Sequence, residues 1–392
     1  MNDPNALARS VGKIISRVIK DGDRALSAYS LRFDGVKVRP SDFFAGRARM
    51  AEGLRRCPKD VLWALKAAKA RIERFHREEA KRLIKSWSVS IDGIRAGQTA
   101  RPVSRAAVYA PGGRTCYPSS VLMTAIPAKI AGVDEIILAT PMKNLKDEVL
   151  AAAYLAGVDR ILCLGGPWAI AALAYGTQTV PKVDKIAGPG NEYVTEAKRQ
   201  VYGQVGIDGL AGPSEIAVWA DARTDPEMAA MNLAAQAEHD PGSKGYLLTS
   251  DRRSAEEIRR RIPSKFLKQM EIRVLGTDAS IAKRINEIAP EHLYLALSKP
   301  ARVLKLIRNA GAIFLGETTS VPLGDYTAGP SHVLPTGTSA RFGSGLSVKD
   351  FMKWNSVIER TRGKGKDAVR SAKIIAGTEN LRYHIRALEA CG

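Results

Sequence analysis

A short motif that recurs every 25 residues constrains the fold of this chain more than any other feature. Val-Asp-Glu-Ile at 133–136, Val-Asp-Arg-Ile at 158–161 and Val-Asp-Lys-Ile at 183–186 share one pattern. A period of this length accommodates a short strand, a helix and their connections. We therefore predict a βαβαβ run, in which parallel strands alternate with helices that cross over the sheet.

Each repeat leads into a turn that contains proline or glycine: Thr140-Pro141, Gly165-Gly166-Pro167 and Gly188-Pro189-Gly190. In a parallel sheet such turns lie at the carboxyl ends of the strands, where open α/β sheets bind ligands. A second series of predicted strands alternates with helical stretches, at 215–220, 245–249, 271–274, 293–297 and 312–315. The sequence thus predicts a second α/β unit.

The segments that flank these units are predicted to be mainly helical. Residues 6–30 and 59–79 carry apolar residues at helical spacing, so the first hundred residues are interpreted as helix-rich. Residues 347–355 and 367–389 are predicted helices, and they follow a long glycine- and proline-rich stretch at 322–346 of the kind that is usually functional. The expected organisation is a helix-rich segment that contributes to core and dimer (1–104), a cofactor-side α/β domain (105–210), a substrate- and metal-side α/β domain (211–335) and a helical dimerisation tail (336–392).

Composition narrows the function classes. Hydrophobic residues make up 45% of the chain and charged residues 26%, as in ordinary soluble globular proteins. No apolar run approaches membrane-spanning length, and the first ten residues lack the layout of a signal peptide, so a cytoplasmic location is expected. The four cysteines form no CxxC pair, which leaves nitrogen and oxygen ligands for any metal.

The net charge of +20 is the one unusual global property. Basic residues are dispersed, and the cluster at 259–261 follows two glutamates by about one turn on a predicted helix, a common pattern of solvated helix faces. The chain has no zinc-finger or RNP-like motif. Binding of nucleic acid is therefore not favoured.

The candidate catalytic chemistry depends on a small number of histidines. Of the five in the chain, His76 lies on a predicted amphipathic helix and is interpreted as structural or exposed. Each of the other four has a polar or acidic companion nearby, in the pairs Gln236 and His239, Glu291 and His292, Asp325 and His332, and Glu379 and His384.

Each pair alone is weak. Gln236 and His239 are three residues apart on a helix that Asp225-Pro226 should start and Pro241 should stop, so both side chains could reach one metal. Glu291 and His292 could share a site only at an irregular strand edge, because adjacent strand residues point to opposite faces. Together the amide, imidazole and carboxylate groups suit zinc or manganese.

The chain resembles the histidinol dehydrogenases over most of its length. The residues that carry the resemblance are VYAPGG (108–113), PSSVLMTAIPAKIAG (118–132), KIAGPGNEYVTEAKRQVYGQVGID (185–208), AGPSE (211–215), QAEH (236–239), PEHL (290–293), GDYTAGPSHVLPT (324–336) and ENLRYHIRALE (379–389). The combination of GPGN, VTEAK and GDY followed by HVLPT is highly specific. The resemblance implies oxidation of L-histidinol to L-histidine through an aldehyde, with two NAD and one zinc ion, in histidine biosynthesis.

The resemblance also assigns roles to individual residues. It implies a metal site made of Gln236, His239, Asp325 and His384, and proton acceptors at Glu291 and His292. It brings Ser119, Ser214, His332 and Glu379 to the substrate, together with the metal ligands and His292. It places Tyr109 and Asn191 against NAD. In the family the C-terminal helix reaches the partner subunit's site, which implies an obligate homodimer that shares its active sites.

The sequence departs from the family pattern on the cofactor side. Trp168 stands where the family usually has a glutamine that contacts the cofactor, and its indole cannot copy that amide; stacking on adenine or nicotinamide is one expected role. Asn380 and Ser331 stand where glycine and asparagine are common. The chain has no GxGxxG, so NAD is implied only by the resemblance.

Two other functions remain as alternatives. One is a paralogous dehydrogenase of another polar alcohol, such as a sulfonated diol; the other is a basic α/β protein that has lost catalysis and binds nucleic acid. Retention of every acid, base and ligand residue argues against both. The predicted fold class is α/β, with two incomplete Rossmann-like parallel-sheet domains and helical extensions at both ends.

Overall fold

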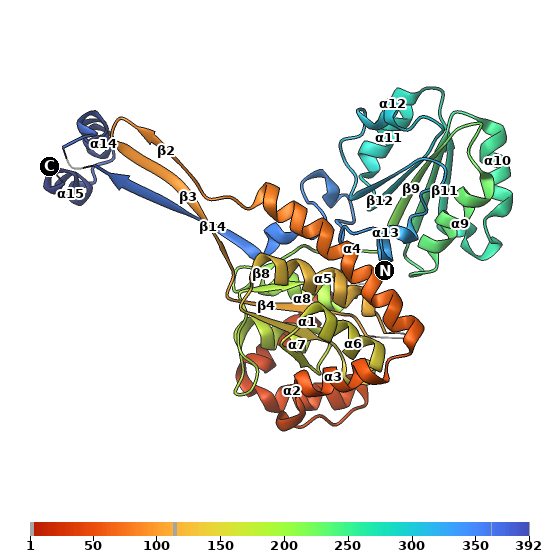
Figure 1. The fold of residues 1–392 in the computed structure, drawn as a ribbon, viewed down its shortest axis with the longest axis horizontal. Helices are drawn as coiled ribbons and strands as arrows, with labels where there is room; N and C mark the ends of the chain where they lie inside the picture. Colours follow the sequence, from red (N-terminus) through yellow and green to blue (C-terminus); the bar gives the residue numbers. More distant parts are fainter. Residues whose placement is uncertain (1–3, 113–115, 362, 392) are drawn as a thin grey trace.

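Two sheets with flanking helices and one long arm make up the molecule (Figure 1); both sheets are parallel except for the antiparallel edge strand β1 of the first. The computed structural model describes residues 4–112, 116–361 and 363–391. The first sheet has the order β1-β6-β5-β4-β7-β8. Its strands are β1 (Phe44–Ala45), β4 (Arg105–Tyr109), β5 (Glu135–Ala139), β6 (Arg160–Leu162), β7 (Lys185–Ala187) and β8 (Gly206–Ile207). The predicted α/β class is confirmed.

The 25-residue repeat is confirmed as the βαβαβ run β5, β6 and β7: β5 is parallel to β4 and β6, and β7 is parallel to β4. The helices that join the strands are α5 (Pro118–Ala131), α6 (Asp147–Ala156), α7 (Gly166–Tyr175) and α8 (Glu192–Val201). Alternate residues of a strand point to opposite faces, so Ile136 and Ile137 of β5 enter two different hydrophobic clusters. Helices therefore cover both faces of this sheet.

The N-terminal residues add helices to both faces. These are α1 (Pro4–Asp21), α2 (Asp23–Tyr29), the π-helical turn η1 (Ser30–Asp34), the 3-10 turn η2 (Pro40–Asp42), α3 (Arg47–Arg56) and α4 (Lys59–Leu83). The helix predicted over 6–30 is interrupted at Gly22, which has a φ of 54° and lies so close to Gln178 that a Cβ would be 2.1 Å from its Oε1.

The second sheet is entirely parallel, in the order β11-β10-β9-β12-β13. Its strands are β9 (Glu215–Ala220), β10 (Lys244–Thr249), β11 (Met270–Val274), β12 (His292–Ala296) and β13 (Ala312–Leu315), and they agree with the five predicted strands to within one residue. Its helices and turns are α9 (Pro226–Ala237), α10 (Arg252–Arg261), η4 (Ser264–Gln269), α11 (Asp278–Ile288) and α12 (Ala301–Leu304).

The arm is the part that sequence patterns described least well. It is an antiparallel sheet of β2 (Trp87–Ile91), β3 (Ile94–Pro102) and β14 (Met352–Arg360), with α14 (Lys366–Thr378) and α15 (Arg382–Ala390) at its tip (Figure 1). The helix predicted over 347–355 is wrong, because only the 3-10 turn η6 (Val348–Phe351) precedes β14. The helix predicted over 367–389 is two helices, separated where Asn380 has a φ of 57°.

The interpretation of the first hundred residues as helix-rich is likewise wrong beyond residue 84. A signal for the hairpin was present, since Asp92 and Gly93 form a two-residue connection in which both φ angles are positive, as a type I′ turn requires. The long stretch 322–346 contains only α13 (Pro322–Tyr326) and η5 (Ser339–Arg341). Among the described helices, none has the length and apolar character needed to cross a membrane.

Candidate active site

The paired central strands of the second sheet bring three sequence-predicted residues together at their amino ends. β12 begins at His292, and it pairs with β9, which begins at Glu215. Ser214 and Glu291 therefore lie side by side, each just before its strand. Glu291 escapes the alternation of the strand, and its Oε2 accepts a hydrogen bond from the backbone N–H of Glu215 at 3.1 Å. Glu291 thus lies just outside the regular strand, the condition under which it and His292 could share one site.

His292 lies between two carboxylates. Its Nδ1 is 3.7 Å from Oε2 of Glu291, and its Nε2 is 3.5 Å from Oδ1 of Asp325, which comes from α13. All three side chains are largely buried. The short helix in the glycine- and proline-rich stretch therefore supplies the second carboxylate of this group.

Burial and mutual charge set the protonation of these groups. Burial raises the pKa of Glu291, and the positive charge of His292 opposes that rise only in part. Burial lowers the pKa of His292, but contact with Asp325 and the charge of Glu291 raise it by more. For Asp325, burial favours a higher pKa, but His292 holds the pKa below its usual range. The arrangement keeps an imidazole able to accept a proton beside a carboxyl group that is harder to ionise.

His332 joins the two sheet domains. Its Nδ1–H donates to the backbone carbonyl of Asp325 at 2.8 Å, and its Nε2 lies 3.3 Å from Oγ of Ser120 on α5. Burial lowers the pKa of His332, which favours the neutral ring. Because a carbonyl can only accept, Nε2 of the neutral ring is the acceptor for the Ser120 hydroxyl. Sequence reasoning named Ser119 here and missed its neighbour Ser120.

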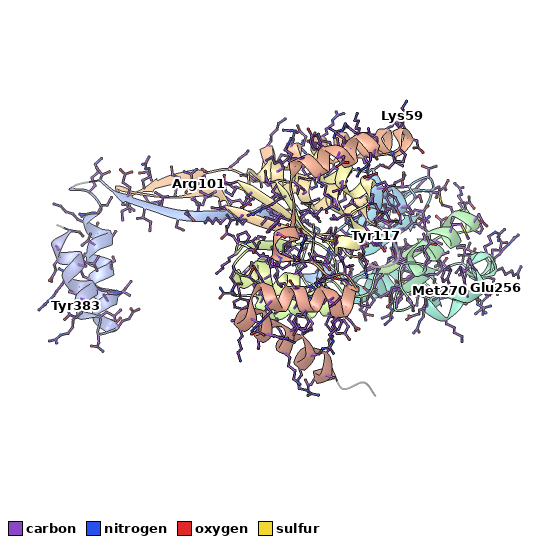
Figure 2. The ribbon with its side chains drawn as sticks, turned by 90° about the horizontal axis from the view of Figure 1, so that it is seen from below. Lys59, Arg101, Tyr117, Glu256, Met270 and Tyr383 are labelled. Atoms are coloured by element: carbon purple, nitrogen blue, oxygen red, sulfur yellow. The ribbon has the colours of Figure 1, made fainter. Side chains whose placement is uncertain are left out.

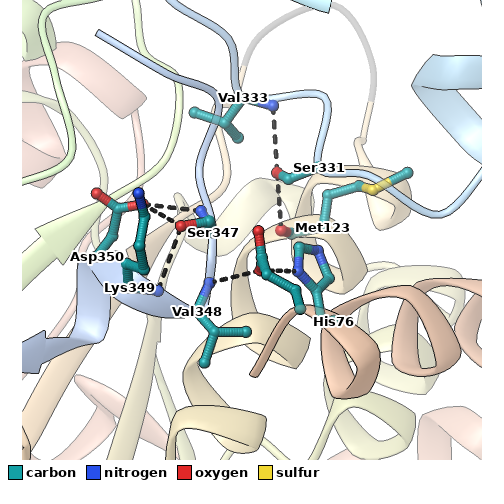
Figure 3. Close-up of polar contacts among 9 residues, drawn as sticks. His76, Met123, Ser331, Val333, Ser347, Val348, Lys349 and Asp350 are labelled. Atoms are coloured by element: carbon teal, nitrogen blue, oxygen red, sulfur yellow. Dashed lines mark hydrogen bonds and ion pairs between the residues drawn. The ribbon is translucent and has the colours of Figure 1, made fainter. Parts of the chain in front are cut away.

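A second network fixes the chain on either side of His332 (Figure 3). Glu79 of α4 contacts Nδ1 of His76 at 2.9 Å and accepts from the backbone N–H of Val348 at 3.1 Å. Ser331 donates to the carbonyl of Met123 on α5 at 3.0 Å. Of the two readings of His76, the structural one is confirmed, because its ring is buried. These contacts fasten the loop that carries His332 to α4 and α5.

The predicted metal ligands are divided between two distant parts of the chain. Gln236 lies in the last turn of α9, whereas His239 lies two residues beyond the helix that was predicted to contain it. His239 is near enough to Asp325 for its charge to lower the pKa of that carboxyl group. Across the described residues, no three His, Cys, Asp or Glu side chains come together as a metal site.

His384 and Glu379 lie at the tip of the arm, on α15 and at the end of α14. Figure 2 shows Tyr383, the neighbour of His384, far from Tyr117 in the body. Both residues are exposed. The structure therefore does not bring them to the other candidate site residues of the same chain.

The cofactor candidates lie at the carboxyl edge of the first sheet, where the strand order reverses between β4 and β7. The hydroxyl of Tyr109 accepts from the backbone N–H of Gly166 at 3.0 Å, and burial raises its pKa to about 12. Asn191 caps α8, with its Oδ1 accepting from the N–H of Val194 at 3.0 Å. The side-chain oxygen of Asn191 is thus already hydrogen-bonded to the first turn of α8.

Gly188 brings these two residues' segments into close contact. It has a φ of 119°, and a Cβ there would lie 2.3 Å from the carbonyl oxygen of Tyr109. Its N–H donates to Oδ2 of Asp208 at 2.7 Å, and its carbonyl accepts from Nζ of Lys198 at 3.0 Å. Lys198 and Asp208 also form a buried ion pair. Lys198 and Asp208 thus bind the carbonyl and the N–H of Gly188, a role that the sequence motifs did not predict.

Trp168 lies in an aromatic cluster. Its ring is 5.3 Å from that of Phe33 and 5.9 Å from that of Tyr29, both in stacked orientation, and it is only 5% exposed. The ring faces that were expected to stack on a cofactor therefore contact other side chains. The buried indole Nε1 has no hydrogen-bond partner among the described residues.

Comparison with known proteins gives one consistent result. The histidinol dehydrogenase family profile matches residues 1–391. The histidinol dehydrogenase of Chromobacterium violaceum is 45% identical over 99% of this chain and 92% of its own length. That of Moorella thermoacetica is 46% identical over 98% of this chain and 94% of its own.

The solved structures agree. The crystal structure of histidinol dehydrogenase from Elizabethkingia anophelis has a TM-score of 0.92 and 31% identity, covering 100% of this chain and 93% of that one. A putative aldehyde dehydrogenase from Burkholderia cenocepacia shares the fold alone, with a TM-score of 0.51, 13% identity, and coverage of 90% of this chain and 92% of that one. The chain belongs to the histidinol dehydrogenase family, whose members are NAD-dependent oxidoreductases.

Proposed function

We propose that the chain oxidises L-histidinol to L-histidine through L-histidinaldehyde, with two NAD as hydride acceptors and one zinc ion in each active site. The first oxidation removes a hydride and a proton from the alcohol. The second adds water to the aldehyde and removes a second hydride. The observation that supports this reaction most directly is the buried group of Glu291, His292 and Asp325 at the start of β12.

The two proton acceptors suit two different tasks. His292 accepts the hydroxyl proton as hydride leaves the alcohol carbon, because an imidazole whose pKa is raised by Asp325 and Glu291 is a stronger base than a free one. Glu291 activates the water that attacks the aldehyde. Its raised pKa makes the carboxylate more basic than an ordinary glutamate, as water activation requires.

The donor set on the body of the chain fits a zinc ion in part. Gln236, His239 and Asp325 offer an amide, an imidazole and a carboxylate, which suit zinc or manganese. A bound zinc ion would hold the imidazole and amino nitrogens of the substrate and so orient its alcohol carbon. The fourth ligand, His384, lies on the arm, so we propose a homodimer in which one copy's arm completes the other copy's site.

The remaining polar side chains recognise the substrate. Ser119, Ser214 and His332 belong to the body, and Glu379 approaches from the partner copy together with His384. The carboxyl edge of the first sheet suits NAD, because open α/β sheets bind ligands where their strand order reverses, and Tyr109 and Asn191 lie at that point. On this arrangement the nicotinamide reaches the substrate between the carboxyl edge of one sheet and the amino edge of the other.

The test is the stoichiometry of NADH formation, followed by absorbance, with a limiting amount of L-histidinol. Two NADH should form for each substrate molecule. The control is a parallel series with other polar alcohols, including a sulfonated diol. Preference for one of those alcohols, or a yield of one NADH, would contradict the proposal.

A further inference from the structure

Three buried polar atoms near the carboxyl edge of the first sheet have no hydrogen-bond partner among the described residues. They are Oδ2 of Asp34, Nδ2 of Asn144 and Nε1 of Trp168. Buried polar groups are normally paired, so each orphaned atom requires an explanation. Two of them belong to segments that contact each other, since Lys143 Nζ is 3.7 Å from the other carboxylate oxygen of Asp34.

Asp34 and the start of α7, the helix that carries Trp168, lie near the Tyr109 phenol. The charge of Asp34 contributes to the raised pKa of Tyr109, whose hydroxyl also contacts Gly166 at the start of α7. Phe33 stacks on Trp168, the third residue of the same helix. Asp34, Asn144 and Trp168 therefore come from three separate segments that meet where β4, β5 and β6 end.

Two glycines of these segments pack directly against neighbouring side chains. A Cβ on Gly165 would lie 2.3 Å from Cγ of Pro141, and one on Gly112 would lie 2.3 Å from Nδ2 of Asn144. Either would require Pro141 or Asn144 to move. The ring of Phe33, beside Asp34, is half exposed, with Trp168 stacked on it and the Arg32 guanidinium 5.1 Å from its centroid.

We propose that Asp34 accepts a hydrogen bond from the 2′-hydroxyl of the adenosine ribose of NAD and thereby selects NAD over NADP, with adenine against Phe33. This inference rests on the NAD dependence proposed above. It concerns the adenosine end, because Asp34 has its contacts in the first domain, whereas the proton acceptors belong to the second. A carboxylate that holds a ribose hydroxyl is a recurrent means of distinguishing the two dinucleotides.

The chemistry of the pair Asp34–Lys143 favours a hydroxyl over a phosphate. The carboxylate is 11% exposed, and burial raises the pKa of Asp34 because water no longer stabilises its charge. A hydroxyl donor would stabilise that charge. A 2′-phosphate would instead bring about two negative charges next to it, and Lys143 can offset only one.

The experiment measures binding of NAD and NADP to the full-length protein by isothermal titration calorimetry, without substrate. Asp34→Asn is compared with Asp42→Asn, a matched control that removes an equally charged side chain from an exposed pair with Arg39. Asp34→Asn should weaken NAD binding on the order of 10- to 100-fold, because it removes a hydrogen bond to a charged group. It should leave NADP binding unchanged or stronger. Asp42→Asn should match the unaltered protein for both.

A second ligand separates recognition from folding. NAD with a 2′-deoxyadenosine should bind the unaltered protein and Asp34→Asn with equal affinity, because the hydroxyl that Asp34 recognises is gone. Equal loss of all three ligands in Asp34→Asn would overturn the proposal, since a distorted site weakens them alike. NAD binding that survives Asp34→Asn would also overturn it. Failure of the unaltered protein to bind NAD at all would instead contradict the proposed function.

Discussion

The two halves of the proposed active site differ in how far one chain completes them. In the body, Glu291, His292 and Asp325 are largely buried, and the ring nitrogens of His292 lie 3.7 Å from Glu291 and 3.5 Å from Asp325. On the arm, Glu379 and His384 are exposed, and no contact among the described side chains fixes them near a second ligand. The body half is organised by its own fold, whereas the arm half depends on something outside the chain.

The surface of the arm indicates which kind of partner could complete the arm half of the site. Every residue of β2 is exposed, including Trp87, and Ile358 of β14 and Tyr383 of α15 are 75% and 81% exposed. Exposed large apolar side chains gathered on one part of a protein are typical of an interaction site. Since the candidate ligand His384 lies on the same arm, the homodimer proposed above would account for both features.

Metal removal should have the largest effect, because the proposed ion joins the two halves. Treatment with a chelator should reduce NADH formation from L-histidinol to background, and added zinc should restore it. The far-ultraviolet circular dichroism should change little, since the cores of both sheet domains contain no metal ligand. Full activity in protein shown to be metal-free would remove the metal from the site.

Mixing two inactive variants tests whether the halves come from different chains. His292→Asn alters only the body and should reduce both oxidations by about 10²- to 10⁴-fold, the usual contribution of a general base. His384→Ala alters only the arm. A mixed dimer contains one site with an intact body and an intact arm, so random exchange should recover about a quarter of the activity of the unaltered protein.

The control for this experiment is a mixture of two body variants, His292→Asn and Asp325→Asn. Each carries its defect in the same half, and no exchange of arms should restore activity. Recovery only in the first mixture would show that sites are shared. No recovery in either mixture, with subunit exchange verified, would place both halves in one chain and contradict the comparison above.

The same comparison explains what could be predicted from the sequence. The 25-residue repeat and the strands of the second sheet were predicted correctly because each is a local pattern whose apolar residues enter a buried core. The start of β14 fell within the predicted helix 347–355, and the rest of the strand was not predicted, because most of its residues are exposed and no periodic burial marks it. Its pairing with β3 joins residues some 250 positions apart, a relation that no local pattern carries.

The site was predictable in a similar way. Motifs identified the residues that precede β12 and β9. The contact of Ser120 with His332 and the hydrogen bond from Lys198 to Gly188 arise from tertiary packing, which no motif records. For Trp168 the resemblance suggested a cofactor contact, whereas packing by Phe33 and Tyr29 buries the ring. The position of the arm relative to a second chain is not encoded in any pattern of this chain alone.

Replacing Glu291 should separate the two oxidation steps, because each is assigned a different proton acceptor in the body. Glu291→Gln should slow the step from aldehyde to acid by about 10²- to 10³-fold and affect the alcohol step much less, because only the former needs an activated water. Single-turnover measurements that start from L-histidinol and from L-histidinaldehyde separate the two steps. Equal loss in both would assign Glu291 a structural role.

The pH dependence of the aldehyde step gives a further check on the same residue. A general base must be deprotonated, and burial raises the pKa of Glu291. Activity should therefore fall on acidification at a higher pH than an ordinary glutamate would give, and the fall should be complete below that raised pKa. An acid limb at the usual glutamate pKa would assign the base to another group.

The smallest expected effect is the loss of stability when an exposed ion pair of the arm is broken, compared with a buried ion pair of the body. Lys198→Met removes the buried cation that pairs with Asp208 and should lower the free energy of unfolding by about 3–5 kcal/mol. Glu359→Gln breaks the pair with Arg95 across β14 and β3, where both side chains are about 60% exposed, and should cost about 0–1 kcal/mol. Urea unfolding followed by circular dichroism compares the two. A large cost for Glu359→Gln would show that a second copy buries this pair, and repeating the titration at decreasing protein concentration should then return the cost to that of a surface ion pair.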